Sequence, residues 1–255
     1  MNVTGNPEEP GSGSCLHKWL FLFGLCFAIW HICPVFLGFE IRNKFTLGDL
    51  VDLTTPYVLI GLVLKLYLLM RRQSMEMTGR VKASAFVYLL FFFGIITFIE
   101  GHGIHLSSNA IYRHLGGSPT SPLSSLTYFF DEIQGHIFWD AGLLLMAFAL
   151  ILLGFSSETS PKLRMNPGWI WAGALLYGFT HFTNGIEGQT VMMTFPAAIL
   201  IPVLLLAFTL HKRLSLSRRP VVLFYLVAYL TADIFFTIWG VLNKGFPQFS
   251  ELGWF

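Results

Sequence analysis

Residues 98–109, FIEGHGIHLSSN, and residues 131–140, DEIQGHIFWD, place histidines and carboxylates where two strongly apolar segments meet polar ones. The first follows an apolar run over 85–97, and the second leads into an apolar run that continues to residue 155. Ionisable groups inside apolar membrane segments are costly and are functional by default. We therefore predict that these two stretches pack against each other and form the centre of the protein.

The composition of the whole chain is that of a membrane protein. Of its 255 residues, 54% are apolar and 12% are charged, against about 25% charged in a soluble domain. The chain has apolar runs of membrane-spanning length, and it lacks the alternating ten-residue pattern of a membrane β-barrel. The predicted fold class is all-α, a polytopic helical bundle. The net charge of +2 gives no indication of nucleic-acid binding.

Seven transmembrane helices fit the apolar pattern, and they divide the chain into three parts. We predict spans at about 18–38, 54–72, 84–104, 126–155, 167–187, 191–211 and 220–243. Residues 1–16 are expected to form a disordered tail, 17–245 the seven-helix domain, and 246–255 a short second tail. Such a chain is an integral, multi-pass membrane protein.

The positive charges predict an orientation. With seven spans, eleven Lys and Arg fall on one side of the membrane and four on the other. Positively charged loops stay in the cytoplasm. The N-terminal tail is therefore predicted to be cytoplasmic and the C-terminal tail to lie outside, and the histidines and carboxylates gather near the non-cytoplasmic face.

Helical spacing groups these polar residues. Glu132, His136 and Asp140 follow at i, i+4 and i+8, so they form one stripe on the 126–155 helix. His102 and His105, three residues apart, share a face of the 84–104 helix. The predicted site residues are the possible metal ligands His102, His105, His136 and His181, the possible bases Glu132 and Glu187, and the supporting groups Glu100, Asn109, Asp131, Asp140, Asn184 and Asp233.

Imidazole and carboxylate groups on three helices are ligands that suit a divalent metal ion, with zinc favoured and iron or copper possible. A metal-bound water with a lowered pKa would be the nucleophile, and Glu132 or Glu187 the base. We therefore expect a metal-dependent membrane enzyme that hydrolyses a membrane lipid or another apolar substrate.

Four alternatives remain open on the sequence. They are an oxidoreductase with a dinuclear iron or copper centre, a proton- or ion-coupled transporter, a structural or assembly subunit of a membrane complex, and a haem protein with paired histidine ligands. The cytoplasmic halves of the predicted spans contain almost no polar residues, which disfavours the transporter. An oligomeric state or a protein partner is not indicated.

In architecture alone, the chain resembles the alkaline ceramidase and adiponectin-receptor superfamily. The resemblance is carried by seven predicted spans with intramembrane histidines and carboxylates. It implies a zinc hydrolase of lipid amides. That family has a histidine pair in its last span, where this chain has none at 220–243, so no site residue is carried over.

Overall fold

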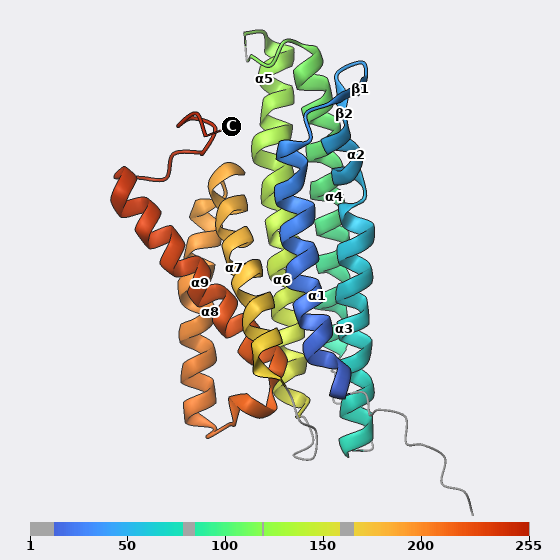
Figure 1. Ribbon diagram of the computed structural model, residues 1–255, viewed down its shortest axis with the longest axis vertical. Coiled ribbons are helices and arrows are strands. Elements are labelled where there is room, and N and C mark those ends of the chain that lie inside the picture. The colour runs from blue at the N-terminus through green and yellow to red at the C-terminus, as the bar shows by residue number, and fades with distance from the viewer. Residues whose placement is uncertain (1–12, 79–84, 119, 159–165, 255) are drawn as a thin grey trace, which may run out of the picture.

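The computed structural model describes residues 13–78, 85–118, 120–158 and 166–254. The described part of the chain is all-α apart from one small hairpin (Figure 1). Its seven long helices are α1 (Gly13–Ile32), α3 (Thr55–Thr78), α4 (Ala85–His114), α6 (His136–Ser156), α7 (Pro167–Glu187), α8 (Val191–His211) and α9 (Pro220–Asn243).

Short elements connect the long helices at the end of the bundle where α1 and α4 finish. A 3₁₀ turn (Cys33–Phe36) follows α1 and leads to an antiparallel hairpin of β1 (Glu40–Arg42) and β2 (Phe45–Thr46). The short helix α2 (Leu47–Leu53) comes next, and a second short helix, α5 (Pro122–Tyr128), precedes a π-helical segment (Phe129–Gly135) that runs into α6. A further 3₁₀ turn (Leu216–Arg218) joins α8 to α9.

Six segments of the described chain are long and apolar enough to cross a membrane: Leu16–Phe36, Leu47–Met75, Ala85–His114, Pro122–Ser156, Val191–His211 and Pro220–Asn243. The chain is therefore a multi-pass integral membrane protein, as its composition predicts. The seventh predicted span, 167–187, is a helix with the predicted bounds, but it is not among these six.

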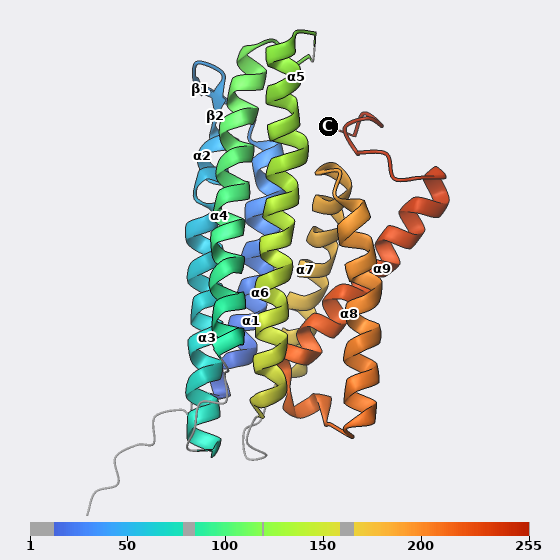
Figure 2. The ribbon, with the colours of Figure 1, turned by 180° about the vertical axis from the view of Figure 1, so that it is seen from behind.

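The long helices run alternately up and down and pack in two connected groups. The most extensive contacts join α4 to α6, α1 to α7, and α7 to α9. Figures 1 and 2 show α4 and α6 side by side along most of their length, while α9 crosses α7 obliquely and ends beside the C-terminal residues. The histidine-bearing ends of α4 and α6 therefore lie at the same end of the bundle.

Glycines bring α4 and α6 into backbone contact. A methyl group at Gly101 would collide with the backbone nitrogen of Trp139, and one at Gly135 would lie 2.9 Å from the backbone nitrogen of His105. Small residues allow such close approach between membrane helices, where lipid supplies no hydrophobic drive for association. This contact brings His105 next to the start of α6.

At both ends of the described chain, residues that the sequence analysis assigned to tails belong to folded structure. Helix α1 begins at Gly13, four residues before the predicted boundary between the tail and the helical domain at residue 17. Residues 1–12 lie outside the described part. Residues 246–254 fold back over the ends of α7 and α9, where Phe249 is buried.

Candidate functional site

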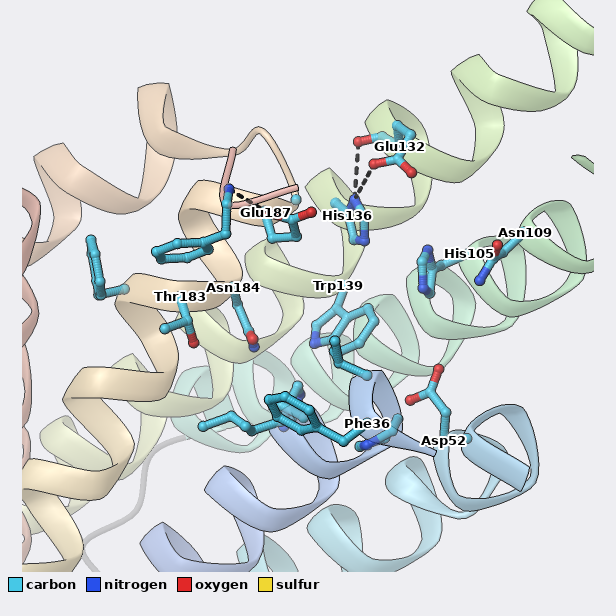
Figure 3. Close-up of a pocket in the computed structure, with 18 of the residues that line it drawn as sticks. Phe36, Asp52, His105, Asn109, Glu132, His136, Trp139, Thr183, Asn184 and Glu187 are labelled. Carbon is cyan, nitrogen blue, oxygen red and sulfur yellow. Dashed lines mark hydrogen bonds and ion pairs between the residues drawn. The ribbon is translucent and has the colours of Figure 1, made fainter. Parts of the chain in front are cut away.

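A cavity of about 700 Å³ lies at the end of the bundle where the polar residues gather. Its volume is typical of small-molecule sites. Its lining comes from α1, α2, α4, the π-helical segment, α6, α7, α9 and the C-terminal residues. Most of the histidines and carboxylates, here called the polar wall, come from α2, α4, the π-helical segment and α6, and most of the aromatic side chains come from α7, α9 and the C-terminal residues. Figure 3 shows His105, Glu132 and His136 of the polar wall.

The first polar pair of the cavity joins α4 to the π-helical segment. Nδ1 of His105 lies 2.8 Å from Oδ1 of Asp131, whose side chain is almost completely buried. The contact places a carboxylate at the Nδ1 edge of the ring without hydrogen-bond geometry, and Nε2 is the nitrogen on the other edge. Asn109, one turn further along α4, lies beside His105 on the cavity wall (Figure 3).

The second polar pair lies within one helical turn. Nδ1 of His136 donates to the backbone carbonyl of Glu132 at 3.0 Å, and a carboxylate oxygen of Glu132 lies 3.9 Å from the same nitrogen. A carbonyl can only accept, so Nδ1 carries the proton and Nε2 of the neutral ring is an acceptor. π-Helical turns are rare in proteins overall, but those that occur are often found at functional sites. Here the turn ends directly before His136.

The two histidine–carboxylate pairs lie next to each other. The ring centroids of His105 and His136 are 4.4 Å apart. Trp139, one turn after His136, packs against both rings with centroid distances of 5.5 and 5.9 Å. The site thus holds two histidines side by side, each with a carboxylate near Nδ1, and both rings pack against the Trp139 ring.

Two further histidines flank Trp139 from other helices. His31 of α1 donates from Nδ1 to the Phe27 carbonyl, which leaves its Nε2 as a buried acceptor with no hydrogen-bond partner among the described residues. His102 donates from Nε2 to the Asp52 carbonyl at 2.8 Å. His31 lines the cavity, whereas His102 is turned toward the end of α2.

The aromatic wall is built from α7, α9 and the C-terminal residues. It contains Phe179, Phe182, Phe235, Trp239, Phe249 and Trp254. The Trp239 ring packs on Phe249 and on Trp254 with centroid distances of 4.6 and 5.3 Å, and its indole nitrogen donates to the Pro247 carbonyl. These contacts fix the C-terminal segment as one side of the cavity.

Glu187, at the end of α7, fastens the same segment. Its Oε2 accepts from the backbone nitrogen of Phe249 at 2.9 Å and from that of Ser250 at 3.4 Å. The Glu187 carbonyl accepts from the side chain of Gln248. Glu187 lines the cavity, and its role as a base stays a prediction. Its Oε2 atom is already occupied by hydrogen bonds to the C-terminal segment, which the sequence did not indicate.

An ion pair closes the rim on the other side. Arg113 of α4 contacts Asp49 of α2 at 2.6 Å, and Asp49 also forms the capping box of α2 with the N-cap residue Thr46. Both charged residues line the cavity, as does Asp52. The sequence analysis did not place Asp49, Asp52 and Arg113 in the site.

The structure brings many of the predicted residues together and leaves others apart. The cavity is lined by His105, Glu132, His136, Asp140, Asn184, Glu187 and Asn109. Asp131 contacts this group through His105. The predicted stripe of Glu132, His136 and Asp140 therefore faces one cavity, and Asp140 also accepts from Thr190.

Four predicted residues lie elsewhere. His181 is buried between Tyr177 and Tyr229, with ring centroids 6.3 and 5.3 Å away, and does not line the cavity. Glu100 is exposed on α4, and Asp233 is partly buried in α9. His102 contacts Asp52 and Trp139 instead of the cavity. The four predicted ligand histidines thus do not point to one place.

The described residues include no group of three or more His, Cys, Asp or Glu arranged to hold a metal ion. Among these residues, His105 and His136 have their rings in contact. Their Nδ1 atoms face carboxylates, an orientation that metal-binding histidines share with histidines that transfer protons. The predicted metal ion therefore stays a prediction.

Sequence reasoning missed Trp139 and His31, which are central to the polar wall. Trp139 follows His136 by three residues, so helical spacing could have placed it on the same face. His31 has no comparable neighbour in the sequence, and its position depends on how α1 packs.

These features define a helical multi-pass membrane protein with a polar-to-aromatic cavity at one end. Among known proteins, the chain is similar to the ceroid-lipofuscinosis neuronal protein 6 homolog of Canis lupus familiaris. The two are 27% identical over 267 residues, an alignment that covers 91% of this chain and 77% of the dog protein. No family model and no solved structure matches the chain.

Proposed function

We propose that the chain is a membrane enzyme that hydrolyses a lipid-like substrate in this cavity. The observation that carries the proposal is the pair of adjacent imidazoles, His105 with Asp131 and His136 with Glu132, at a cavity that also has an aromatic wall. A hydrolase needs a base for water and an acid for the leaving group. Two neighbouring histidines supply both functions.

The cavity suits an amphipathic substrate. The wall formed by Phe182, Trp239 and Phe249 offers apolar contacts to a hydrocarbon chain, and the polar wall offers His136 and Glu132 to a polar head group. Phe179 and Ile238 both line the cavity and are exposed on α7 and α9. Because exposed apolar side chains of membrane helices face lipid, these residues support entry from the bilayer.

The side chains favour water as the nucleophile. Among the described cavity-lining residues there is no Ser or Cys, so a covalent route through either is not supported. Nε2 of His136 accepts the proton of a water molecule because Nδ1–H is held by the Glu132 carbonyl. The neighbouring imidazole of His105, whose Nδ1 lies 2.8 Å from Oδ1 of Asp131, relays this proton to the leaving group.

A metal-assisted form of this reaction is the second candidate. The carboxylates behind His105 and His136 favour it, because such contacts orient metal-bound imidazole rings. A zinc, iron or copper ion would polarise the substrate carbonyl and lower the pKa of a bound water.

We further propose that α7 is a seventh span and that the N-terminus is cytoplasmic. Its 21 residues are long enough for a hydrocarbon core of about 30 Å. The excess of Lys and Arg on one side of a seven-span arrangement supports the orientation. Glycosylation acceptor sites added after residue 255 should be modified, and modification at the N-terminus instead would overturn the orientation.

The hydrolase is tested with purified protein in nanodiscs and a panel of ester- and amide-linked lipids carrying a labelled acyl chain. We expect release of the labelled chain, and His136→Ala should slow it by roughly 10²–10⁴-fold, the range for loss of general acid–base catalysis. His211→Ala, an exposed histidine at the other end of the bundle, is the matched control. Equal rates in both variants would contradict the proposal.

A further inference from the structure

The polar wall of the cavity is rich in hydrogen-bond acceptors. Nε2 of His136 accepts because Nδ1 donates to a carbonyl, and Nε2 of His31 accepts for the same reason. Glu132 and Glu187 add carboxylate oxygens on either side of His136 (Figure 3). A ligand head group that meets these atoms must therefore bring donors.

The same wall contains few positive charges. Five carboxylates line the cavity, those of Asp49, Asp52, Glu132, Asp140 and Glu187, and Arg113 is the one Lys or Arg among the described lining residues. Arg113 already contacts Asp49 at 2.6 Å. A phosphate or carboxylate head group would thus face five carboxyl groups and one guanidinium group that already pairs with Asp49.

We propose that the cavity selects long-chain amphiphiles whose head group donates hydrogen bonds and carries no negative charge, such as an acylated polyol. The hydroxyl groups donate to Glu132 and to Nε2 of His136, and the hydrocarbon chain lies along the aromatic wall. This inference rests on the proposed lipid site and adds the chemistry of the head group.

A buried N–H group without a hydrogen-bond partner indicates that the same ligand also carries a hydrogen-bond acceptor, an oxygen atom next to its donors. Trp139 is 8% exposed, and its indole nitrogen has no hydrogen-bond partner among the described residues. In Figure 3 this nitrogen lies on the edge of the ring that faces Asn184, whose amide nitrogen is also buried and unpartnered. An indole N–H can only donate, so a carbonyl or ether oxygen beside the hydroxyl groups complements it.

The test compares two lipids that differ in one group, 1-O-oleyl glycerol and its 3-phosphate. Their ether linkage resists hydrolysis, so binding is measured without turnover. Binding to the full chain in nanodiscs made of zwitterionic lipid is followed by isothermal titration. We expect the glycerol lipid to bind at least roughly tenfold more tightly, because like-charge contacts disfavour the phosphate.

Glu132→Gln should reduce this preference several-fold, since it removes one of the facing charges and adds a donor. Glu100→Gln, the same change at an exposed position of α4 outside the cavity, should leave it unchanged. Equal or tighter binding of the phosphate to the unmodified chain would overturn the inference while leaving the lipid site in place. Failure of both lipids to bind would overturn the proposed lipid site as well.

Discussion

Glu187, at the last turn of α7, holds the backbone nitrogen of Phe249 at 2.9 Å and so attaches the C-terminal segment to the side of the cavity. The two residues are 62 positions apart. This contact makes the aromatic wall a product of three parts of the chain, α7, α9 and the residues after α9.

Glu187→Gln should loosen the C-terminal segment. The substitution replaces a charged acceptor of two backbone amides, those of Phe249 and Ser250, and hydrogen bonds to charged groups contribute about 1.5–3 kcal/mol each. Hydrogen exchange of residues 247–254 should become faster. Glu100→Gln is the control, and unchanged exchange in the Glu187 variant would show that the aromatic contacts of Trp239 suffice.

Gly101→Ala should separate α4 from α6 at the level of the site. The added methyl group would collide with the Trp139 backbone, whereas the same change at Gly103 meets nothing within 4 Å. Gly103→Ala should be neutral or stabilise α4 by about 0.5–1 kcal/mol. Thermal unfolding in detergent should show a lower Tm for Gly101→Ala alone, and equal Tm values would contradict the close contact.

Arg113→Ala should destabilise the rim of the cavity. The substitution leaves the buried carboxylate of Asp49 without its partner at 2.6 Å, and removing one member of a buried ion pair costs about 3–5 kcal/mol. Arg113 is itself partly exposed, so we expect a smaller loss. Adding Asp49→Asn should recover part of the stability, and a double-mutant cycle without coupling would contradict the pair.

Metal content separates the two forms of the proposed reaction. Elemental analysis of gently purified protein should give about one zinc per chain if the metal-assisted form holds, with His136→Ala losing it and His211→Ala retaining it. Iron or copper would instead favour the oxidoreductase. Equal metal content in both variants would contradict a metal at the paired histidines.

Much of the fold follows from the apolar pattern. The predicted helices 167–187, 191–211 and 220–243 have the bounds seen in α7, α8 and α9. Pro167 and Pro220 begin two of these helices, where proline suits the first turn. The predicted start of the fourth span at 126 falls within α5, because the membrane-length segment Pro122–Ser156 joins two helices through a π-helical turn.

The site could be predicted only as far as helical spacing reaches. Spacing placed Glu132, His136 and Asp140 on one stripe, and all three line the cavity. The pairing of Asp131 with His105 depends on how α4 and α6 rotate against each other. The separation of His181 and the inclusion of His31 depend on packing of α7 and α1, which periodicity within one helix does not determine.

The most direct test of the central claim is photo-crosslinking of a long-chain lipid that carries a diazirine near the end of its chain, followed by peptide mass spectrometry. If the cavity holds the lipid, the labelled residues, assigned by fragmenting the labelled peptides, should be Phe182, Trp239 or Phe249, and excess unlabelled lipid should reduce the labelling. Val241, which is exposed on α9 and does not line the cavity, reports on bulk bilayer contact. Labelling confined to positions such as Val241, without competition, would contradict a lipid site in the cavity.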